Sequence, residues 1–392
     1  VPALICSLIT KREERFLNRQ SLIYPEINMA RNTRINLFTI TFILICIGTV
    51  MIYSTSSIYA WERYKDSLFF LKRHISFLII GSILTLLVMS IDYKKFRRWA
   101  KPVLILSVLL LVLVLIPHIG REVAGARRWF RLKFISFQPS ELANIAIIIY
   151  IADFIARKSD YIKTFWQGFL PPMFILGATA LLILAQPDLG TVLALGIVVF
   201  IMLFVAGVRV SYLLSVVLAS LPLLYVLIFN VPYRRMRIMS FLNPWLDPKG
   251  SSFQVIQSQI ALGSGGIFGV GLGHSRQKLF YLPAAHTDFI FSIIGEELGL
   301  LGTVGVIILL IIFIQQGLKI IKNASEKFGY FLSLGLVLMI SLKAVINIGV
   351  SCGVLPTKGL PLPFISYGGS SFVFDMISVG ILMNIARTGE YP

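Results

Sequence analysis

Long apolar segments recur along the chain, with short polar stretches between most of them. A helix needs roughly 20 apolar residues to cross the hydrocarbon core of a bilayer. The strands of a transmembrane barrel would be half polar and only about 10 residues long, so that class is excluded. The pattern predicts a polytopic bundle of about ten transmembrane helices, the eighth long enough to be tilted or broken. They lie near residues 35–53, 75–91, 102–118, 141–156, 168–186, 189–207, 211–230, 288–316, 328–352 and 362–386.

The composition fits the same class. Of the 392 residues, 57% are hydrophobic and 14% are charged, and the mean hydropathy is +0.84. About a quarter of the residues are charged in an ordinary soluble domain. A soluble enzyme, a disordered protein and a nucleic-acid-binding protein are therefore all disfavoured. Three scattered cysteines are too few for a disulfide framework or a metal site. We expect an all-α integral membrane protein with no nucleic-acid partner.

Basic residues outnumber acidic ones by 36 to 18, which gives a net charge of +18. The positive-inside rule places both termini in the cytoplasm, with 92–101 as a strongly basic cytoplasmic loop. The margin is narrow because the predicted outer loops 119–140 and 231–287 are also basic, which suggests a negatively charged ligand at the outer face. The implied organisation is a cytoplasmic tail over 1–34, one transmembrane domain over 35–387 and a short cytoplasmic tail over 388–392.

The largest polar block is the loop 231–287, predicted to be periplasmic between the seventh and eighth helices. Loops of this length are uncommon unless they are functional or disordered, and aromatic residues throughout argue against disorder. Its glycine-rich run 263–273 would let the backbone approach a ligand closely. The run lacks the lysine pattern of a nucleotide-binding loop. Two interpretations stay open, a re-entrant or surface hairpin and direct substrate contact.

Asp288 directly precedes the apolar run FIFSII and so lies at the membrane boundary. A carboxylate at the edge of hydrocarbon is costly and marks a candidate functional site. Desolvation would raise its pKa, as suits a general base near neutral pH. A helix N-cap is the alternative, and residue type alone favours it.

Glu296 and Glu297 point about 100° apart on a helix and do not form a paired site. Asp188 and Asp375 are interpreted as helix-end or packing groups.

Two further segments carry cations on the predicted outer face. Arg127 and Arg128 are adjacent to Trp129. Guanidinium groups pair bidentately with phosphate, and we favour a specific phosphate role over general lipid headgroup contact. Segment 353–371 contains three prolines and four glycines, so it cannot be a continuous helix. Unwound backbone near a membrane lines protein or a water-filled cavity, and Lys358 lies within this segment.

Four stretches of the sequence resemble motifs of the SEDS family, the shape, elongation, division and sporulation proteins. The resemblance covers about residues 37–387. Within the family, HTDFIFSIIGEELG and LPTKGLPLPFISYGGSS are more similar to the division branch than to the elongation branch. The four stretches are GARRWF…FQPSEL (125–142), AQPDLGT (185–191), the segment 237–302 and INIGVSCGVLPTKGLPLPFISYGGSS (346–371).

The resemblance implies a ten-helix protein of the bacterial inner membrane that polymerises lipid II into glycan strands on the outer face during cell division. Lipid II is an undecaprenyl-pyrophosphate-linked disaccharide-pentapeptide. The essential acidic residue of the family falls on Asp288, which favours the general base over the N-cap. A divalent cation, Mg²⁺ or Mn²⁺, would bind mainly through the substrate pyrophosphate, because no dedicated cage of ligands is visible. Substrate-binding groups carry over onto Arg127, Arg128, Gln138, Arg276, Lys278 and Lys358.

The chain departs from the family pattern at three positions. Asn144 stands where members commonly have lysine, Ala284 stands where the division branch often has glutamate, and Lys343 replaces an expected glutamine. We expect these changes to affect secondary charge contacts and not the main site.

Two other functions compete with polymerisation, a lipid II flippase and a scaffold that recruits a class B penicillin-binding protein. The resemblance also implies that penicillin-binding protein, and other membrane proteins of the division machinery, as partners. Gly299, Gly302 and Gly305 recur every three residues along the eighth span. Such a stripe permits close helix approach, either to the partner's transmembrane helix or within the bundle.

Overall fold

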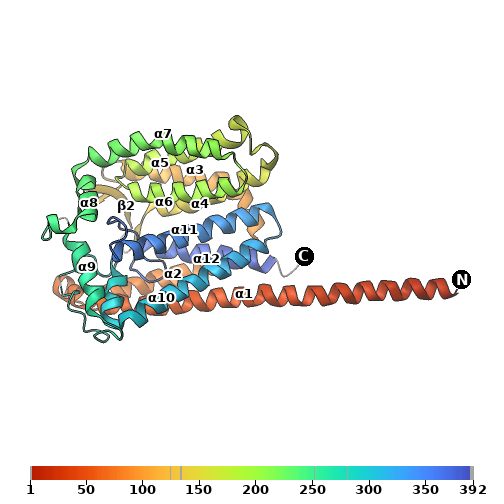
Figure 1. Ribbon diagram of the computed structural model, residues 1–392, viewed down its shortest axis with the longest axis horizontal. Helices are drawn as coiled ribbons and strands as arrows, with labels where there is room; N and C mark the ends of the chain where they lie inside the picture. The colour runs from red at the N-terminus through yellow and green to blue at the C-terminus, as the bar shows by residue number, and fades with distance from the viewer. Residues whose placement is uncertain (1, 124, 133–134, 251, 280, 389–392) are drawn as a thin grey trace.

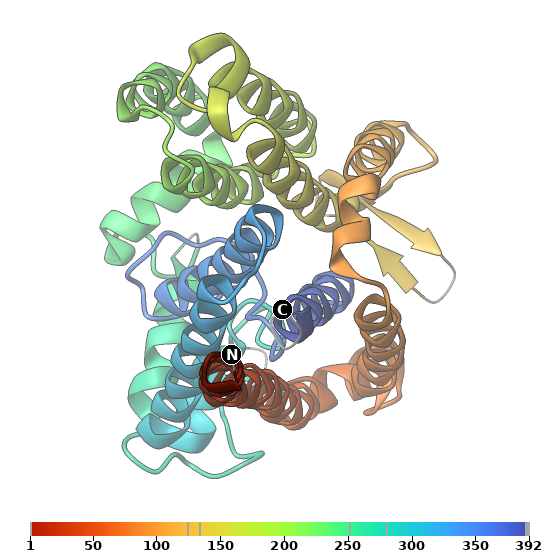
Figure 2. The ribbon, with the colours of Figure 1, turned by 90° about the vertical axis from the view of Figure 1, so that its right-hand side faces the viewer.

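The computed structural model describes residues 2–123, 125–132, 135–250, 252–279 and 281–388. Its long helices run roughly parallel to one another and form a bundle, and the first helix extends far beyond it (Figure 1). Figure 2 looks along the helices from the end where α1 (Pro2–Tyr64) begins and α12 (Ser370–Thr388) ends. The chain therefore starts and finishes on the same side of the bundle, as an even number of membrane crossings requires.

All ten predicted spans are helical, which confirms the fold class. Nine described helices are long and apolar enough to cross a membrane, and α6 is a shorter apolar helix. Besides α1 and α12, the spans are α2 (Phe69–Ser90), α3 (Phe96–Leu115), α4 (Pro139–Arg157), α5 (Leu170–Leu184), α6 (Leu189–Val205), α7 (Val210–Phe229), α10 (Ile290–Lys322) and α11 (Lys327–Ser351). Short turns of helix are η1 (Tyr93–Lys95), η2 (Ser159–Tyr161) and η3 (Phe165–Phe169).

The predicted domain boundaries stay predictions. Helix α1 continues without interruption from the predicted tail over 1–34 into the first span. At the other end, residues 389–392 of the predicted tail 388–392 lie outside the described residues.

The connecting segments contain more structure than the sequence pattern indicated. Loop 119–140 forms a small antiparallel sheet, and loop 231–287 contains helices. The last span begins at Ser370 and not near 362, because prolines and glycines in the preceding segment prevent helix formation. The added elements are β1 (Arg121–Val123), β2 (Ala126–Leu132), β3 (Ile135–Phe137), in the order β1-β2-β3, and α8 (Pro232–Leu242), η4 (Pro244–Leu246) and α9 (Phe253–Ser264).

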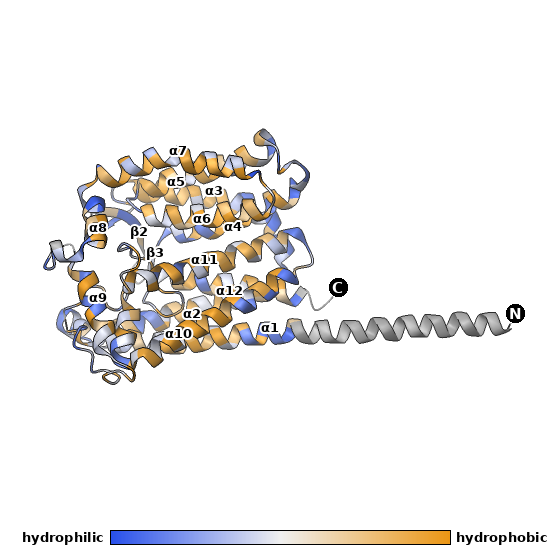
Figure 3. Cartoon of the chain, viewed as in Figure 1, coloured by the Kyte–Doolittle hydropathy of each residue, from blue (hydrophilic) through white to orange (hydrophobic). Residues whose placement is uncertain are grey.

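The sheet, α8 and α9 gather at one end of the bundle, here called the loop-rich end (Figure 1). Helix surfaces between the two ends are largely hydrophobic, and hydrophilic residues concentrate at the ends (Figure 3). The most apolar stretches of α4 and α12 are 83% buried, whereas that of α7 is 6% buried. Helices α4 and α12 therefore lie in the centre of the bundle, and α7 exposes its apolar side chains as expected for contact with lipid.

A buried group of charges joins three helices in the centre. The Lys343 ammonium on α11 lies 2.8 Å from the Glu141 carboxylate on α4 and 3.0 Å from the Asp375 carboxylate on α12. Charges inside a membrane protein persist only when they are paired. The unexpected lysine at 343 therefore supplies the ammonium that these carboxylates share, and the packing role predicted for Asp375 is confirmed.

Helix α10 is broken at Gly299, where φ is 68° and ψ is −162°. The glycine-rich run packs against this break as a hairpin: the Val270 N–H donates to the Glu296 carbonyl at 2.9 Å, and the Leu300 N–H donates to the Gly266 carbonyl at 2.9 Å. A Cβ atom on Gly299 would collide with the hairpin backbone. Gly299, Gly302 and Gly305 therefore do not form one continuous helical face, and the predicted docking stripe is wrong.

Candidate functional site

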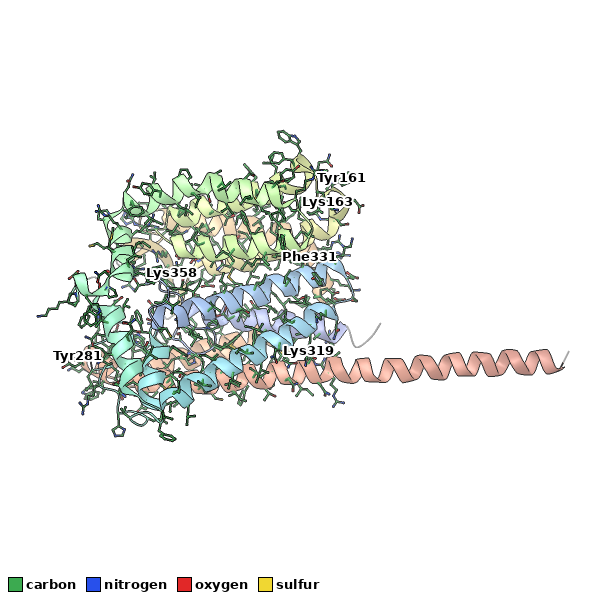
Figure 4. The ribbon with its side chains drawn as sticks, in the orientation of Figure 1. Tyr161, Lys163, Tyr281, Lys319, Phe331 and Lys358 are labelled. Carbon is green, nitrogen blue, oxygen red and sulfur yellow. The ribbon has the colours of Figure 1, made fainter. Side chains whose placement is uncertain are left out.

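Three segments that each precede a helix meet at the loop-rich end. They are the turn before α6, the turn before α10 and the unwound stretch before α12, which carry Asp188, Asp288 and Lys358 respectively. Lys358 lies near the loop-rich end, whereas Lys163 and Lys319 lie toward the opposite end (Figure 4). The structure thus brings together charged side chains that are far apart in the sequence. Asp188 precedes Asp288 by 100 residues, and Asp288 precedes Lys358 by 70 residues.

Lys358 forms an ion pair with Asp188 from the turn before α6. Its Nζ atom lies 2.5 Å from Asp188 Oδ1, and both side chains are largely buried. Asp188 also caps α6, because its carboxylate accepts hydrogen bonds from the Thr191 N–H at 3.3 Å and the Thr191 hydroxyl at 2.9 Å. The helix-end role predicted for Asp188 is confirmed. No sequence pattern indicated that the same carboxylate is the counter-ion of Lys358.

Two glycines make room for this arrangement. The side chain of Lys358 crosses directly over Gly190, where a Cβ atom would overlap its last carbon atoms. A Cβ atom on Gly359 would lie 2.7 Å from the Asp288 Oδ2 atom. The backbone next to Lys358 therefore lies against the Asp288 carboxylate, and only glycine permits that approach.

Asp288 is not the cap of α10. The N-cap position is held by Phe289, and the backbone N–H of Asp288 donates to the Ala284 carbonyl at 3.1 Å. The capping alternative for Asp288 is therefore wrong. Burial raises the pKa of the Asp288 carboxyl above its ordinary value, and the positive charges of Arg237 and Lys358 partly oppose this effect.

Arg237 is a member of the site that the sequence reasoning missed. It lies on α8, and its guanidinium donates to the carbonyl of Thr357 at 2.9 Å. Thr357 is the residue directly before Lys358. Burial lowers the pKa of the Lys358 ammonium, the Asp188 carboxylate opposes this effect, and the positive charges of Arg128 and Arg237 add to the lowering. Arg237 opens the segment RIMSFLNPW, one of the stretches that carry the family resemblance. Its position in that stretch was the signal that could have identified Arg237 as a site residue.

The adjacent residues Arg127 and Arg128 have different surroundings. The Arg128 guanidinium donates to the Gln186 carbonyl at 2.7 Å and the Pro187 carbonyl at 2.6 Å, so it reaches the turn that carries Asp188. Arg127 pairs with Glu122 at 3.2 Å, and both side chains are exposed to a large extent. Successive side chains of a strand point to opposite faces, so β2 directs only one of these arginines to the site.

Arg276 and Lys278 belong to a second, structural group at the break in α10. The Lys278 ammonium is buried in an ion pair with Glu297, at 2.7 Å. The Arg276 side chain is exposed, and its backbone N–H donates to the Glu296 carboxylate at 2.9 Å. Glu296 and Glu297 therefore fasten this loop to α10.

Gln138 joins two helices near the sheet. Its N–H donates to the Ser370 hydroxyl at the start of α12, at 3.1 Å, and its side-chain amide donates to the Ser140 hydroxyl at 2.9 Å. These contacts place Gln138 at the start of α4. Its predicted role in substrate binding stays a prediction, as do those of Arg127, Arg276 and Lys278.

The described residues include no group of three or more His, Cys, Asp or Glu side chains that could hold a metal ion. The two carboxylates at the site, Asp188 and Asp288, each lie beside cationic side chains. A protein cage for Mg²⁺ or Mn²⁺ does not fit this donor set, because such ions need several oxygen ligands. Binding of a divalent ion through substrate phosphates stays a prediction.

The charged residues that meet here are called the Asp288 cluster: Arg128, Asp188, Arg237, Asp288 and Lys358. Three cations and two carboxylates give a net positive charge, which suits an anionic ligand such as a phosphate. The Asp288 carboxyl has a raised pKa and lies within the field of two of these cations, which suits a proton acceptor close to that anion. The arrangement can therefore combine anion binding with general base catalysis.

Comparison with known proteins gives consistent results. Residues 34–391 match the family model FtsW/RodA/SpoVE, described as cell cycle protein. A probable peptidoglycan glycosyltransferase FtsW of Geobacter metallireducens is 47% identical over 343 residues, which cover 88% of this chain and 92% of the relative. Stage V sporulation protein E of Bacillus subtilis is 42% identical over 355 residues, which cover 91% of this chain and 97% of the relative.

Solved structures show the same fold. A chain of a peptidoglycan synthase complex that coordinates polymerization and crosslinking superposes with a TM-score of 0.74 at 31% identity, covering 91% of this chain and 98% of that one. The rod shape determining protein RodA of Thermus thermophilus gives a TM-score of 0.68 at 26% identity, covering 91% and 97%. This multi-pass membrane protein therefore belongs to the FtsW/RodA/SpoVE family of cell cycle proteins.

Proposed function

We propose that this chain is a peptidoglycan glycosyltransferase, which polymerises lipid II on the outer face of the bacterial inner membrane. The observation that carries the proposal is the half-buried Asp288 carboxyl, against which the backbone next to Lys358 lies. Desolvation raises the pKa of this carboxyl, and the charges of Arg237 and Lys358 partly oppose that rise. The FtsW relatives, 47% identical, support the reaction class. They also support a role in division, in agreement with the division-branch motifs.

The geometry suits a displacement at the anomeric carbon of a sugar pyrophosphate. Asp288 accepts the proton from the 4-hydroxyl of one sugar as its oxygen attacks that carbon. A new C–O bond forms, the bond from the anomeric carbon to the pyrophosphate oxygen breaks, and the pyrophosphate leaves with the bonding electrons. The cations Lys358, Arg128 and Arg237 stabilise the charge that develops on the leaving group. Lys358 has three N–H donors, so it can contact phosphate while it keeps Asp188.

The partner and the location are also part of the proposal. A solved relative is part of a peptidoglycan synthase complex that coordinates polymerization and crosslinking. This supports a class B penicillin-binding protein as the partner of this chain, and further division proteins are proposed from the family resemblance. The loop-rich end would face the periplasm at the division septum, with both termini in the cytoplasm.

The test is polymerisation by the purified protein, alone and with its class B penicillin-binding protein. Labelled lipid II is added in detergent, and products are separated by gel electrophoresis. The proposal expects a ladder of glycan strands. A flippase would move lipid II across a vesicle membrane without making polymer, and a scaffold would retain its partner without either activity. If no polymer forms in either preparation, the proposed function is wrong.

Replacement of Arg237 with glutamine is expected to move the acidic limb of the pH–rate profile to higher pH. The Arg237 charge lowers the pKa of Asp288, so its removal raises that pKa. The base works only when it is deprotonated, and a higher pKa means that activity begins to fall at a higher pH. The measurement is kcat against pH. Arg235→Gln, an exposed position on the same helix, is the control, and equal profiles for both variants would refute the electrostatic role of Arg237.

Replacement of Gly190 with alanine is expected to displace Lys358. The added methyl group would overlap the lysine side chain, and overpacking of this kind typically costs about 1–3 kcal/mol. We expect the rate at low lipid II concentration to fall about fivefold or more. Gly196→Ala on the same helix is a matched control, because a Cβ atom there meets no atom within 4 Å. Similar rates for the two variants would count against the assigned path of Lys358.

A further inference from the structure

Asn347 connects the segment that carries the proposed base, Asp288, to the segment that carries the cation Lys358. It lies on α11 and its side chain is fully buried, with 0% exposure. Its Nδ2 atom donates one hydrogen bond to the backbone carbonyl of Asp288 at 2.9 Å and another to the backbone carbonyl of Leu360 at 2.7 Å. Leu360 follows Lys358 by two residues. A single amide group thus holds both segments.

We propose that Asn347 is a positioning residue for the glycosyl transfer, which fixes Asp288 and Lys358 relative to each other. The inference rests on the proposed function and deepens it. Asn347 does not need to touch the substrate to have this effect. It sets where the base-bearing turn and the cation-bearing segment meet, and displacement of a reacting group by about 1 Å can reduce a rate about a hundredfold.

The chemistry of the amide group explains why asparagine is suited to the position. An NH₂ group has two donors, and two carbonyl oxygens face it. The Oδ1 atom of Asn347 has no hydrogen-bond partner within the described part of the chain. A buried polar atom without a partner destabilises the fold. That asparagine stands here despite this cost suggests that the double donation matters.

The position of Asn347 is fixed by the rest of α11. Lys343 lies one turn earlier on the same helix and is held by Glu141 and Asp375 from two neighbouring helices. Sites built on rigid helices are held more accurately than sites on loops. The segments that carry Asp288 and Lys358 are also linked directly, because the Tyr367 N–H donates to the His286 carbonyl at 3.0 Å. That link lies nine residues beyond Lys358, whereas Leu360 lies only two residues beyond it, so the Asn347 bridge is closer to the Asp288 cluster than this link is.

A matched control exists elsewhere in the bundle. Asn384 on α12 is 1% exposed, and its Nδ2 atom donates to the backbone carbonyls of Val88 at 3.1 Å and Met89 at 3.0 Å. Its Nδ2 atom also donates to the Ile91 carbonyl, and its Oδ1 atom accepts from the Tyr93 N–H at 3.1 Å. It is therefore a second buried amide that holds backbone groups, but it joins the last helix to the end of α2 and the start of η1. A purely structural role predicts similar consequences for the loss of either side chain.

The experiment compares Asn347→Ala with Asn384→Ala in the full chain, in complex with its partner. Initial polymerisation rates are measured against lipid II concentration, and rates are corrected for the folded fraction. We expect Asn347→Ala to reduce kcat about tenfold to a hundredfold and to change the acidic limb of its pH profile. Asn384→Ala should keep kcat within about twofold. Equal kcat values for the two variants would overturn the inference.

Hydrogen exchange supplies a readout that does not depend on activity. Asn347→Ala should increase amide exchange in both 281–289 and 355–361, and Asn384→Ala should leave these segments unchanged. Unchanged exchange in both variants would overturn the inference even if the wild-type protein polymerises lipid II. If the wild-type protein makes no polymer, the proposed function fails, and the exchange experiment still tests the bridge.

Asn347→Ser covers the case in which the alanine variant does not fold. A serine hydroxyl has one donor, so it can serve one of the two carbonyls at most. We expect kcat to fall below the wild-type value, by less than the tenfold to hundredfold loss expected for full removal of the amide, with increased exchange in at least one of the two segments. Wild-type kcat in a folded Asn347→Ser protein, with unchanged exchange, would overturn the inference.

Discussion

Replacement of Asp288 with asparagine is expected to reduce lipid II polymerisation by at least about a hundredfold. General base catalysis typically contributes 10²- to 10⁴-fold to a rate, and an amide cannot accept the proton. The substitution keeps the shape of the side chain. Because Asp288 is not the cap of α10, we expect expression and membrane insertion to stay near the wild-type level. The measurement is polymer yield from labelled lipid II.

Asp66→Asn is the matched control for this experiment. Asp66 lies in the short connection between α1 and α2, where it pairs with the exposed Lys72 at 2.7 Å. Loss of that surface pair should have little effect, because exposed ion pairs contribute about 0–1 kcal/mol. Polymer yield in Asp288→Asn within about twofold of the control would show that Asp288 is not the general base.

Replacement of Lys358 with glutamine is expected to raise the apparent KM for lipid II about tenfold or more. A hydrogen bond to a charged group is worth about 1.5–3 kcal/mol, which corresponds to roughly a tenfold to a hundredfold change. The substitution also leaves the Asp188 carboxylate buried without its counter-ion, so stability falls as well. The measurement is the initial rate against lipid II concentration, together with the melting temperature.

The double variant Asp188→Asn with Lys358→Gln separates these two effects. It removes both charges, so it should recover most of the lost thermal stability. It should not recover affinity, because the ammonium that contacts phosphate is still absent. Recovery of wild-type KM in the double variant would show that Lys358 only neutralises Asp188, and its role in substrate binding would be discarded.

The sequence predicted the helices well because a membrane imposes a strict pattern. Each span must be apolar over most of its length, and all ten predicted segments are helical. The length of the eighth span predicted that this helix would be tilted or broken, and α10 is broken. The location of the break at Gly299 was not predicted, because the break depends on the hairpin that packs there from another part of the chain. The small sheet was missed because β1 and β3 have only three residues each, too few to show an alternating pattern.

The candidate site was only partly predictable. Asp288 and Lys358 stand out in the sequence, one as a carboxylate at a membrane boundary and the other as a cation in an unwound segment. Residue type did not distinguish Arg128 from Arg127, since that difference depends on which face of β2 meets the Asp188 turn. Gly190 acts through its contact with Lys358, which is over 100 residues away in the sequence. Asn347 acts through a hydrogen bond to Asp288, which lies outside its own helix. No local sequence pattern indicates such contacts.

The most direct test of the account separates lipid II binding from its conversion. The affinity of the purified complex for lipid II is measured in wild type, Asp288→Asn and Lys358→Gln, and the polymer yield is determined in the same preparations. We expect Asp288→Asn to bind lipid II within about threefold of wild type and to make no detectable polymer, whereas Lys358→Gln should bind lipid II at least about tenfold more weakly. Polymer formation by Asp288→Asn at the wild-type rate would show that Asp288 is not the general base.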